Sequence, residues 1–156
     1  MKKIKSIILI LSIFLFFHSC SYQKMNSVNQ KKFFIKEFEV KGDKRESFII
    51  QKKIQRFSNE NSTSKIKILI DLKKNKSIKE KNIKNKVTKY NLTLSANVTI
   101  IDLNTNTEIK RIFTAQQTYN VDDSYSNTVN NSKEANNSLI ETIVDEILDQ
   151  LRIYYS

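Results

Sequence analysis

Residues 90–100 of this 156-residue chain alternate strictly between apolar and polar side chains. Successive side chains of a β-strand point to opposite faces, so this pattern predicts a long strand with one apolar face. Residues 109–119 repeat much of the alternation, and the polar stretch DLNTNT between the two segments is typical of a turn, where Asn104 and Asn106 can take left-handed backbone angles. The two segments predict a β-hairpin whose apolar face must be covered. Its apolar positions are Tyr90, Leu92, Leu94, Ala96, Val98, Ile100, Ile109, Phe113, Ala115 and Tyr119.

Two more strands are predicted upstream of the hairpin. Residues 65–72 alternate cleanly and predict a half-buried strand. Residues 31–40 predict a first strand. In that first strand, we expect Phe34, Phe38 and Val40 on one side and Phe33 and Ile35 on the other. The lysine-rich run at 73–86 is predicted as a solvated loop, with a ligand-binding arm as the alternative.

An amphipathic helix is predicted after the first strand. The single glycine, Gly42, ends that strand. Asp43 then has the character of an N-cap, and Glu46 stands where a capping box places its acid. Ile50, Ile54 and Phe57 follow at spacings of four and three, so we expect one helix of about four turns.

A second amphipathic helix is predicted at the C-terminus. Asn131 and Glu134 have the spacing of an N-cap and its third helical residue. A wide apolar stripe follows, which normally packs on a sheet; a coiled-coil partner is the less favoured use. The stripe consists of Leu139, Ile140, Ile143, Val144, Ile147, Leu148 and Leu151.

The predicted order of elements is therefore β-α-β-β-β-α. A sheet of about four strands, mostly antiparallel, with both helices on one face makes an α+β fold, a two-layer α/β sandwich. The uncovered face of that sheet is rich in Thr, Ser, Asn and Gln. We expect this face to contact water or a partner.

The N-terminus has the pattern of an export signal. Lysines precede an apolar run from Ile7 to Phe17, which is too short to span a membrane. A small residue, Ser19, directly precedes the only cysteine, Cys20, which resembles the lipobox of bacterial lipoproteins. We therefore expect residues 1–19 to be a lipoprotein signal peptide, residues 20–30 a tether and residues 31–156 a single domain. The alternative is an ordinary signal peptide that happens to hold a cysteine.

The lipobox implies a covalent lipid on Cys20. Two or more acyl chains hold a protein stably on a membrane, so we expect the mature chain to be anchored to a membrane without spanning it. Ser21 follows the cysteine, where an aspartate would favour retention at the inner membrane. By this resemblance the protein is expected in the outer membrane, lipid-anchored and facing the periplasm.

The formal net charge of +11 favours an anionic partner. Phospholipid headgroups or lipopolysaccharide fit this charge, whereas export argues against nucleic acid. Part of the lysine content reflects a general richness in Lys, Asn and Ile, as in proteins of AT-rich genomes.

The mature chain lacks the residues that most catalytic and metal sites need. It has no histidine, no second cysteine and a single glycine. The adjacent acids Asp122 and Asp123 would need further partners to hold a metal or move a proton. The sequence therefore predicts no enzyme activity, no metal and no cofactor other than the lipid on Cys20.

Several short motifs stand out along the chain: Cys20 with Tyr22, Lys89-Tyr90-Asn91-Leu92, the turn Asp102 to Asn106, Thr118-Tyr119-Asn120 and Ser124-Tyr125-Ser126. In combination they resemble the LptE family of lipopolysaccharide-assembly lipoproteins, in particular divergent alphaproteobacterial members. Two departures from the family pattern are Ser21, where a glycine is common, and Asn106, which replaces a turn glycine. Asparagine tolerates a left-handed turn position.

This resemblance implies a function. LptE-like proteins sit in the outer membrane as plugs in the lumen of the LptD β-barrel, help that barrel to fold and help to deliver lipopolysaccharide to the outer leaflet. We hypothesise that four basic residues contact lipopolysaccharide; scattered solubilising charges are the alternative. The four are Lys86, Lys89, Lys110 and Arg111. Two rival functions are an auxiliary lipoprotein of an ABC-type lipid-transport system and a purely structural surface lipoprotein.

Overall fold

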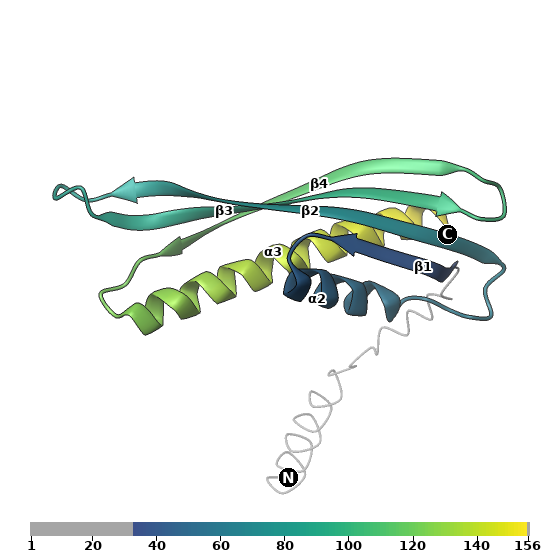
Figure 1. Cartoon of the computed structure of the whole chain (residues 1–156), viewed down its shortest axis with the longest axis horizontal. Helices are drawn as coiled ribbons and strands as arrows, with labels where there is room; N and C mark the ends of the chain where they lie inside the picture. Colours follow the sequence, from purple (N-terminus) through teal and green to yellow (C-terminus); the bar gives the residue numbers. More distant parts are fainter. Residues whose placement is uncertain (1–32, 156) are drawn as a thin grey trace, which may run out of the picture. The chain divides into compact units, whose positions relative to one another are not determined.

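The computed structural model describes residues 33–155, and within them the predicted order of elements is confirmed (Figure 1). The expected signal peptide (1–19) and the whole of the expected tether (20–30), with Cys20, lie outside the described residues. The elements are β1 (Phe33–Lys41), α2 (Lys44–Gln55), β2 (Ser64–Lys81), β3 (Val87–Asp102), β4 (Glu108–Asn120) and α3 (Tyr125–Tyr154).

The four strands form one sheet in the order β1-β2-β3-β4. β1 runs parallel to β2, and the other two pairs are antiparallel. Both helices lie on the same face of this sheet, as Figure 1 shows. The predicted α+β sandwich is confirmed, with a mixed sheet.

A single hydrophobic core lies between the sheet and the helices. The apolar positions of the alternating strands face it, which confirms the predicted faces of β2, β3 and β4. Among the described residues, the members of this core lie between Phe33 and Leu151. The large side chains that are fully buried in it are Ile50, Ile54, Ile66, Ile68, Leu94, Val98, Ile100, Leu139, Ile140, Ile143, Ile147 and Leu151.

The predicted faces of β1 are wrong. The register against β2 shifts between Ile35 and Glu37, which marks a β-bulge. One extra residue reverses the alternation, so Ile35 before the bulge and Phe38 and Val40 after it all pack against the core. Simple alternation would have placed these side chains on opposite faces.

Helix α2 is shorter than predicted, although its N-cap is confirmed. The Asp43 carboxylate accepts hydrogen bonds from the backbone N–H groups of Arg45 and Glu46 at 2.9 and 3.2 Å. These bonds hold the pKa of Asp43 below its usual value. The helix ends at Gln55, so Phe57 lies beyond it and is partly exposed.

Helix α3 begins seven residues before the predicted start. Its N-cap is Ser124, and Asn131 lies in the second turn of the helix. The side chain of Asn131 instead donates a hydrogen bond of 3.2 Å to the carbonyl of Asn120 on β4. The first turns of α3 therefore pack beside the end of β4. The sequence did not predict them because their residues are polar and form no apolar stripe.

The lysine-rich run is mostly strand. β2 continues to Lys81, and its residues from Leu72 onward pair with β3. Backbone pairing with a neighbouring strand does not depend on side-chain polarity, which is why the composition misled the prediction. β1 stops pairing at Asp71, so beyond that point the outer edge of β2 has no strand neighbour in the described chain.

Candidate functional site

We call the two ends of the sheet the distal and the proximal end. The distal end holds the β2–β3 turn, the last residues of β4 and the start of α3 (Figure 1). The proximal end holds the β3–β4 turn and the last turn of α3. In the β3–β4 turn, Asn106 has the expected left-handed backbone with φ 57°, whereas Asn104 is not among the described residues with positive φ.

The four basic residues predicted to contact lipopolysaccharide fall into two separate pairs. Lys86 and Lys89 lie at the distal end, and Lys110 and Arg111 lie at the proximal end. Lys110 pairs with Thr99, which is ten residues from Lys89 on β3, a distance of about 33 Å along an extended strand. The structure therefore does not gather the four into one patch.

Each member of the distal pair faces an acid. The ammonium of Lys89 lies 2.7 Å from a carboxylate oxygen of Glu80. Lys86, in the β2–β3 turn, is 3.7 Å from the fully exposed carboxylate of Asp123. Exposed pairs of this kind are weak, so both lysines can exchange their partner for a phosphate.

The proximal pair is split between the two faces of the sheet. Lys110 lies on the face of the sheet away from the helices, and its ammonium is 3.0 Å from a carboxylate oxygen of Glu108. Arg111 pairs with the buried Val98, and its guanidinium donates a hydrogen bond of 3.1 Å to the hydroxyl of Tyr154 on α3. Arg111 therefore also ties the edge strand to the final helix.

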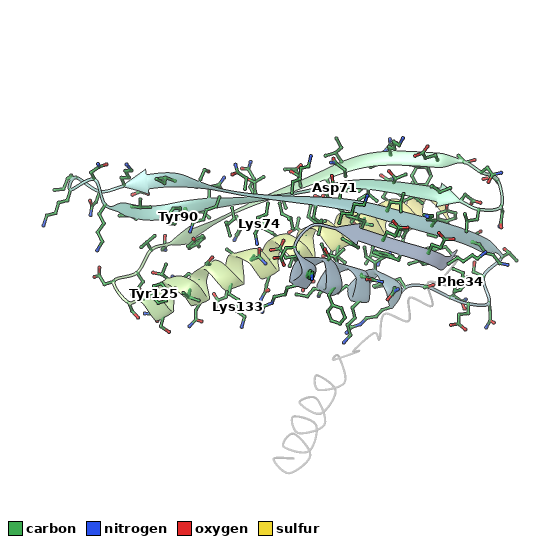
Figure 2. All side chains as sticks on the ribbon, in the orientation of Figure 1. Phe34, Asp71, Lys74, Tyr90, Tyr125 and Lys133 are labelled. Atoms are coloured by element: carbon green, nitrogen blue, oxygen red, sulfur yellow. The ribbon has the colours of Figure 1, made fainter. Side chains whose placement is uncertain are left out.

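A lysine and two tyrosines gather on the helix side of the sheet at the distal end. The rings of Tyr90 and Tyr119 stack with centroids 5.6 Å apart. The ammonium of Lys76 lies 3.8 Å from the Tyr90 centroid and 5.5 Å from that of Tyr119. Figure 2 shows Tyr90 between the sheet and α3. A cation held over aromatic faces in this way is stabilised by the ring quadrupoles.

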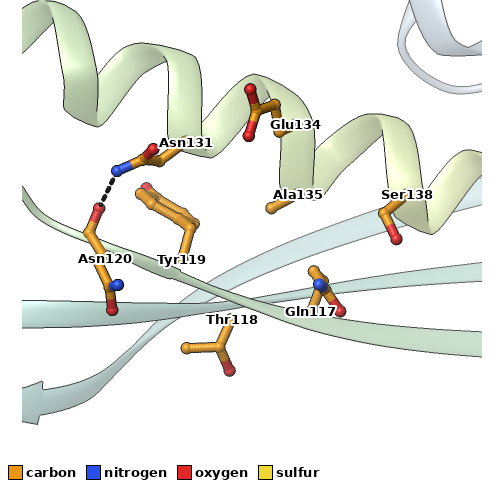
Figure 3. A pocket seen from close by; sticks show the side chains of 8 residues that line it. All are labelled: Gln117, Thr118, Tyr119, Asn120, Asn131, Glu134, Ala135 and Ser138. Carbon is orange, nitrogen blue, oxygen red and sulfur yellow. Dashed lines mark hydrogen bonds between the residues drawn. The ribbon is translucent and has the colours of Figure 1, made fainter.

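An open groove of about 360 Å³ lies beside this cluster, between β4 and α3 (Figure 3). Tyr119 points toward the helix in Figure 3, and the Asn131–Asn120 hydrogen bond closes one end. Its lining offers amides, hydroxyls and one carboxylate, Glu134, but no basic group. The groove therefore suits neutral polar groups better than phosphates. Its lining residues are Gln117, Thr118, Tyr119, Asn120, Asn131, Glu134, Ala135 and Ser138.

Sequence reasoning missed Lys76, although a signal was present. Lys74, Lys76 and Ile78 continue the every-second-residue register of Leu72 and thus share its face of β2. Ile78 pairs with Tyr90, so this face of β2 continues as far as the tyrosine cluster. If the two-residue alternation of residues 65–72 is continued past Leu72 without regard to polarity, it predicts that Lys74 and Lys76 lie on the same face as the core residues.

The face of the sheet away from the helices is polar along its centre. Its rows include Thr93, Ser95 and Asn97 on β3, and the hydroxyls of Ser95 and Thr114 lie 3.1 Å apart. We call this surface the open face. It is the predicted uncovered face, and it combines hydrogen-bonding groups with the charged Asp71 and Lys73, which pair with Asn97 and Ser95.

Near β1 the open face carries ion pairs. The ammonium of Lys67 lies 2.8 Å from Glu37 and 3.4 Å from Glu39. Hydrogen bonding to Lys67 lowers the pKa of Glu37, and hydrogen bonding to Glu37 raises the pKa of Lys67. These pairs join the parallel strands β1 and β2 on their exposed side.

Residues 33–155 contain neither a metal-binding cluster nor a helix that could span a membrane. Histidine, cysteine, aspartate and glutamate side chains do not come together there in any group of three or more that could hold a metal ion. No helix in this range is both long enough and apolar enough to cross a membrane.

The fold and the site define a two-layer α+β domain with both helices on one face, an open polar face and a lysine-rich distal end. Residues 39–152 match the model of the family described as "LptE: Lipopolysaccharide-assembly", and the chain belongs to this family. The family consists of non-enzymatic, outer-membrane-associated lipoproteins, and membership supports a role in lipopolysaccharide transport. No curated protein matches the chain by sequence.

Solved structures of bacterial lipoproteins share the fold. A minor lipoprotein from Acinetobacter baumannii superimposes with a TM-score of 0.58 at 16% identity, covering 80% of this chain and 92% of that one. A lipoprotein B from Nitrosomonas europaea gives 0.55 at 15% identity, with 79% and 86% covered. The rare lipoprotein B from Shewanella oneidensis gives 0.51 at 11% identity, with 74% and 92% covered. At such identities the likeness concerns the fold alone.

Proposed function

We propose that this chain is an outer-membrane lipoprotein, anchored by a lipid on Cys20, which acts as plug and assembly partner of an LptD-like β-barrel. In this function it helps to deliver lipopolysaccharide to the outer leaflet, and it uses no metal, no cofactor and no catalytic group. The observation that carries the proposal is the family match over residues 39–152, which spans every element from the end of β1 to α3.

The open face supports the plug function. The interior of a large outer-membrane barrel is polar, so a protein inside it needs a hydrogen-bonding surface. Thr93, Asn97 and Thr114 belong to such a surface, and the helices cover the opposite, apolar face of the sheet. A domain built in this way can fill a wet lumen without exposing its core.

The distal lysines support contact with lipopolysaccharide. Lysine ammonium groups form charge-assisted hydrogen bonds with phosphates. Lys86 and Lys89 lie at an end where further lysines, such as Lys76, add to the positive field. Lys110 and Arg111 remain the second proposed contact, at the proximal end.

The experiment is an affinity pull-down of the tagged, acylated protein from detergent-solubilised membranes, with partners identified by mass. We expect an LptD-like barrel in about equal amount. Depletion of the lipoprotein should also reduce mature barrel and make the outer membrane leaky. Recovery of an ABC-transporter subunit, or of no barrel from membranes that contain one, would refute the proposed partnership. A Cys20→Ser variant is the control for the anchor. It cannot carry the lipid, so we expect less of it in the membrane fraction.

A further inference from the structure

The β2–β3 turn forms a tip that is closed by hydrogen bonds of its own. The backbone N–H of Asn82 donates to the carbonyl of Lys86 at 2.9 Å. The side-chain oxygen of Asn82 accepts hydrogen bonds from the N–H groups of Lys84 and Lys86, each at 3.0 Å. Asn85 takes a left-handed backbone with φ 59°, which asparagine tolerates. The turn is therefore held by its own side chains.

This turn presents one apolar side chain to the outside. Ile83 is 103% exposed, the highest value among the exposed large apolar side chains of residues 33–155. Figure 1 shows the turn projecting beyond the ends of β4 and α3. Single exposed apolar side chains are common on protein surfaces, so Ile83 points to a partner through its combination with the charges around it.

Lysines surround this isoleucine. Lys81 and Lys84 flank it, and both are exposed. Within residues 73–89 the only acid is Glu80, which is paired with Lys89, and there is no arginine. Lysine is a point charge on a flexible stem, which suits a diffuse layer of negative charge better than the bidentate recognition of one headgroup.

We propose that the β2–β3 tip docks on the surface of an anionic phospholipid membrane. Lys81 and Lys84 contact headgroup phosphates, while Ile83 enters the boundary between the headgroups and the acyl chains. Basic residues around an apolar group are the combination that binds such an interface. The docking goes beyond the proposed function, because it gives the domain a second membrane contact that requires neither the barrel nor lipopolysaccharide.

The test uses the absence of tryptophan from the chain. Ile83→Trp places a single tryptophan at the tip, and Ile112→Trp, at a 73% exposed site on β4, is the matched control. Both are made in the mature chain with Cys20→Ser, which keeps the whole core and removes the acyl anchor. Vesicles of phosphatidylcholine with and without phosphatidylglycerol, and lipopolysaccharide micelles, are the probes.

We expect a blue shift of Ile83→Trp on vesicles that contain phosphatidylglycerol, and no shift of Ile112→Trp. In the Ile83→Trp background, Lys81→Gln with Lys84→Gln should weaken binding about tenfold or more, since each lysine near an anionic surface contributes to binding. The matched pair Lys36→Gln with Lys44→Gln removes equal charge from exposed sites elsewhere and should leave binding within about twofold.

Three outcomes would overturn the proposal. The first is no shift at position 83, and the second is an equal shift at both tryptophans. The third is a shift at position 83 with lipopolysaccharide micelles but not with phospholipid vesicles, which would assign the tip to lipopolysaccharide phosphates. Because no barrel is present in this assay, its failure is distinguishable from failure of the barrel partnership.

Discussion

The ammonium of Lys74 on β2 pairs with the carboxylate of Glu46 on α2, at a point where α3 also approaches. Glu46 is only 3% exposed, and Lys74 donates a further hydrogen bond of 3.3 Å to Asn136 on α3. Glu46 is the buried charged residue of the described domain, and its partner comes from the segment that the sequence predicted as a loop. The Lys74 side chain therefore links β2 to both α2 and α3.

Removal of Lys74 should destabilise the domain more than removal of both partners. Lys74→Met leaves the Glu46 carboxylate buried and unpaired, so we expect a loss of about 2 to 3 kcal/mol in the free energy of unfolding. Adding Glu46→Leu to that variant should restore much of the loss, because no unpaired charge remains. Urea unfolding of the two single variants and the double variant measures the coupling. Additive losses across this cycle would show that the pair does not couple.

Gly42 should not tolerate a side chain. Its φ is +130°, a region that L-residues rarely adopt, and an added Cβ would lie 2.8 Å from the Cβ of Leu72. Gly42→Ala should therefore lower the free energy of unfolding by about 2 kcal/mol or more. Lys41→Ala, at the exposed neighbouring position, is the control and should change it by less than about 0.5 kcal/mol. Equal values for the two variants would mean that β1 can shift away from β2.

Tyr155 should make the domain lose stability in strong alkali. Burial and the carboxylate of Asp102 raise the pKa of Tyr155 from 10.0 to about 12. Between these two values the unfolded chain releases this proton and the folded chain keeps it, so stability is full below pH 10 and falls toward pH 12. Because the group is partly exposed, we expect a loss of about 1 kcal/mol from this source.

The Tyr155→Phe variant isolates this contribution from the titration of the lysines. Its free energy of unfolding, measured by urea across the same pH range, should fall less steeply than that of the natural chain. The ring contact with Phe33, at a centroid distance of 5.8 Å, is kept in the variant. Parallel pH curves for the two proteins would contradict the assignment.

The two basic pairs should contribute unequally to lipopolysaccharide binding. Reversing Lys86 and Lys89 to Glu removes charge from the lysine-rich distal end, and we expect affinity to fall about tenfold or more. Reversing Lys110 and Arg111 makes the same change of net charge at the proximal end and should cost about threefold or less. Binding of purified protein to lipopolysaccharide at two salt concentrations provides the measurement. Equal losses would indicate a response to net charge alone.

Much of the fold followed from the periods in the sequence. The alternation at 90–100 and 109–119 predicts β3 and β4 with their buried faces, because side-chain direction in a strand depends only on position. The stripe from Leu139 to Leu151 predicts the buried part of α3 for the same reason, with the helical period. The N-cap at Asp43 was also predictable from local sequence, since its carboxylate accepts hydrogen bonds from N–H groups in the first turn of the same helix.

The sequence by itself thus determined the strands, the helices, their order and the motifs of the family. Only the tertiary structure decided the bulge after Ile35, the strand character of residues 73–81 and the early start of α3 at Tyr125. These features depend on hydrogen bonds and contacts with segments distant along the chain, such as the pairing of Lys76 with Leu92. The same holds for the site. The chain shows how many lysines it has, but the register of the strands decides which of them lie together, and it places Lys89 and Lys110 at opposite ends of the sheet.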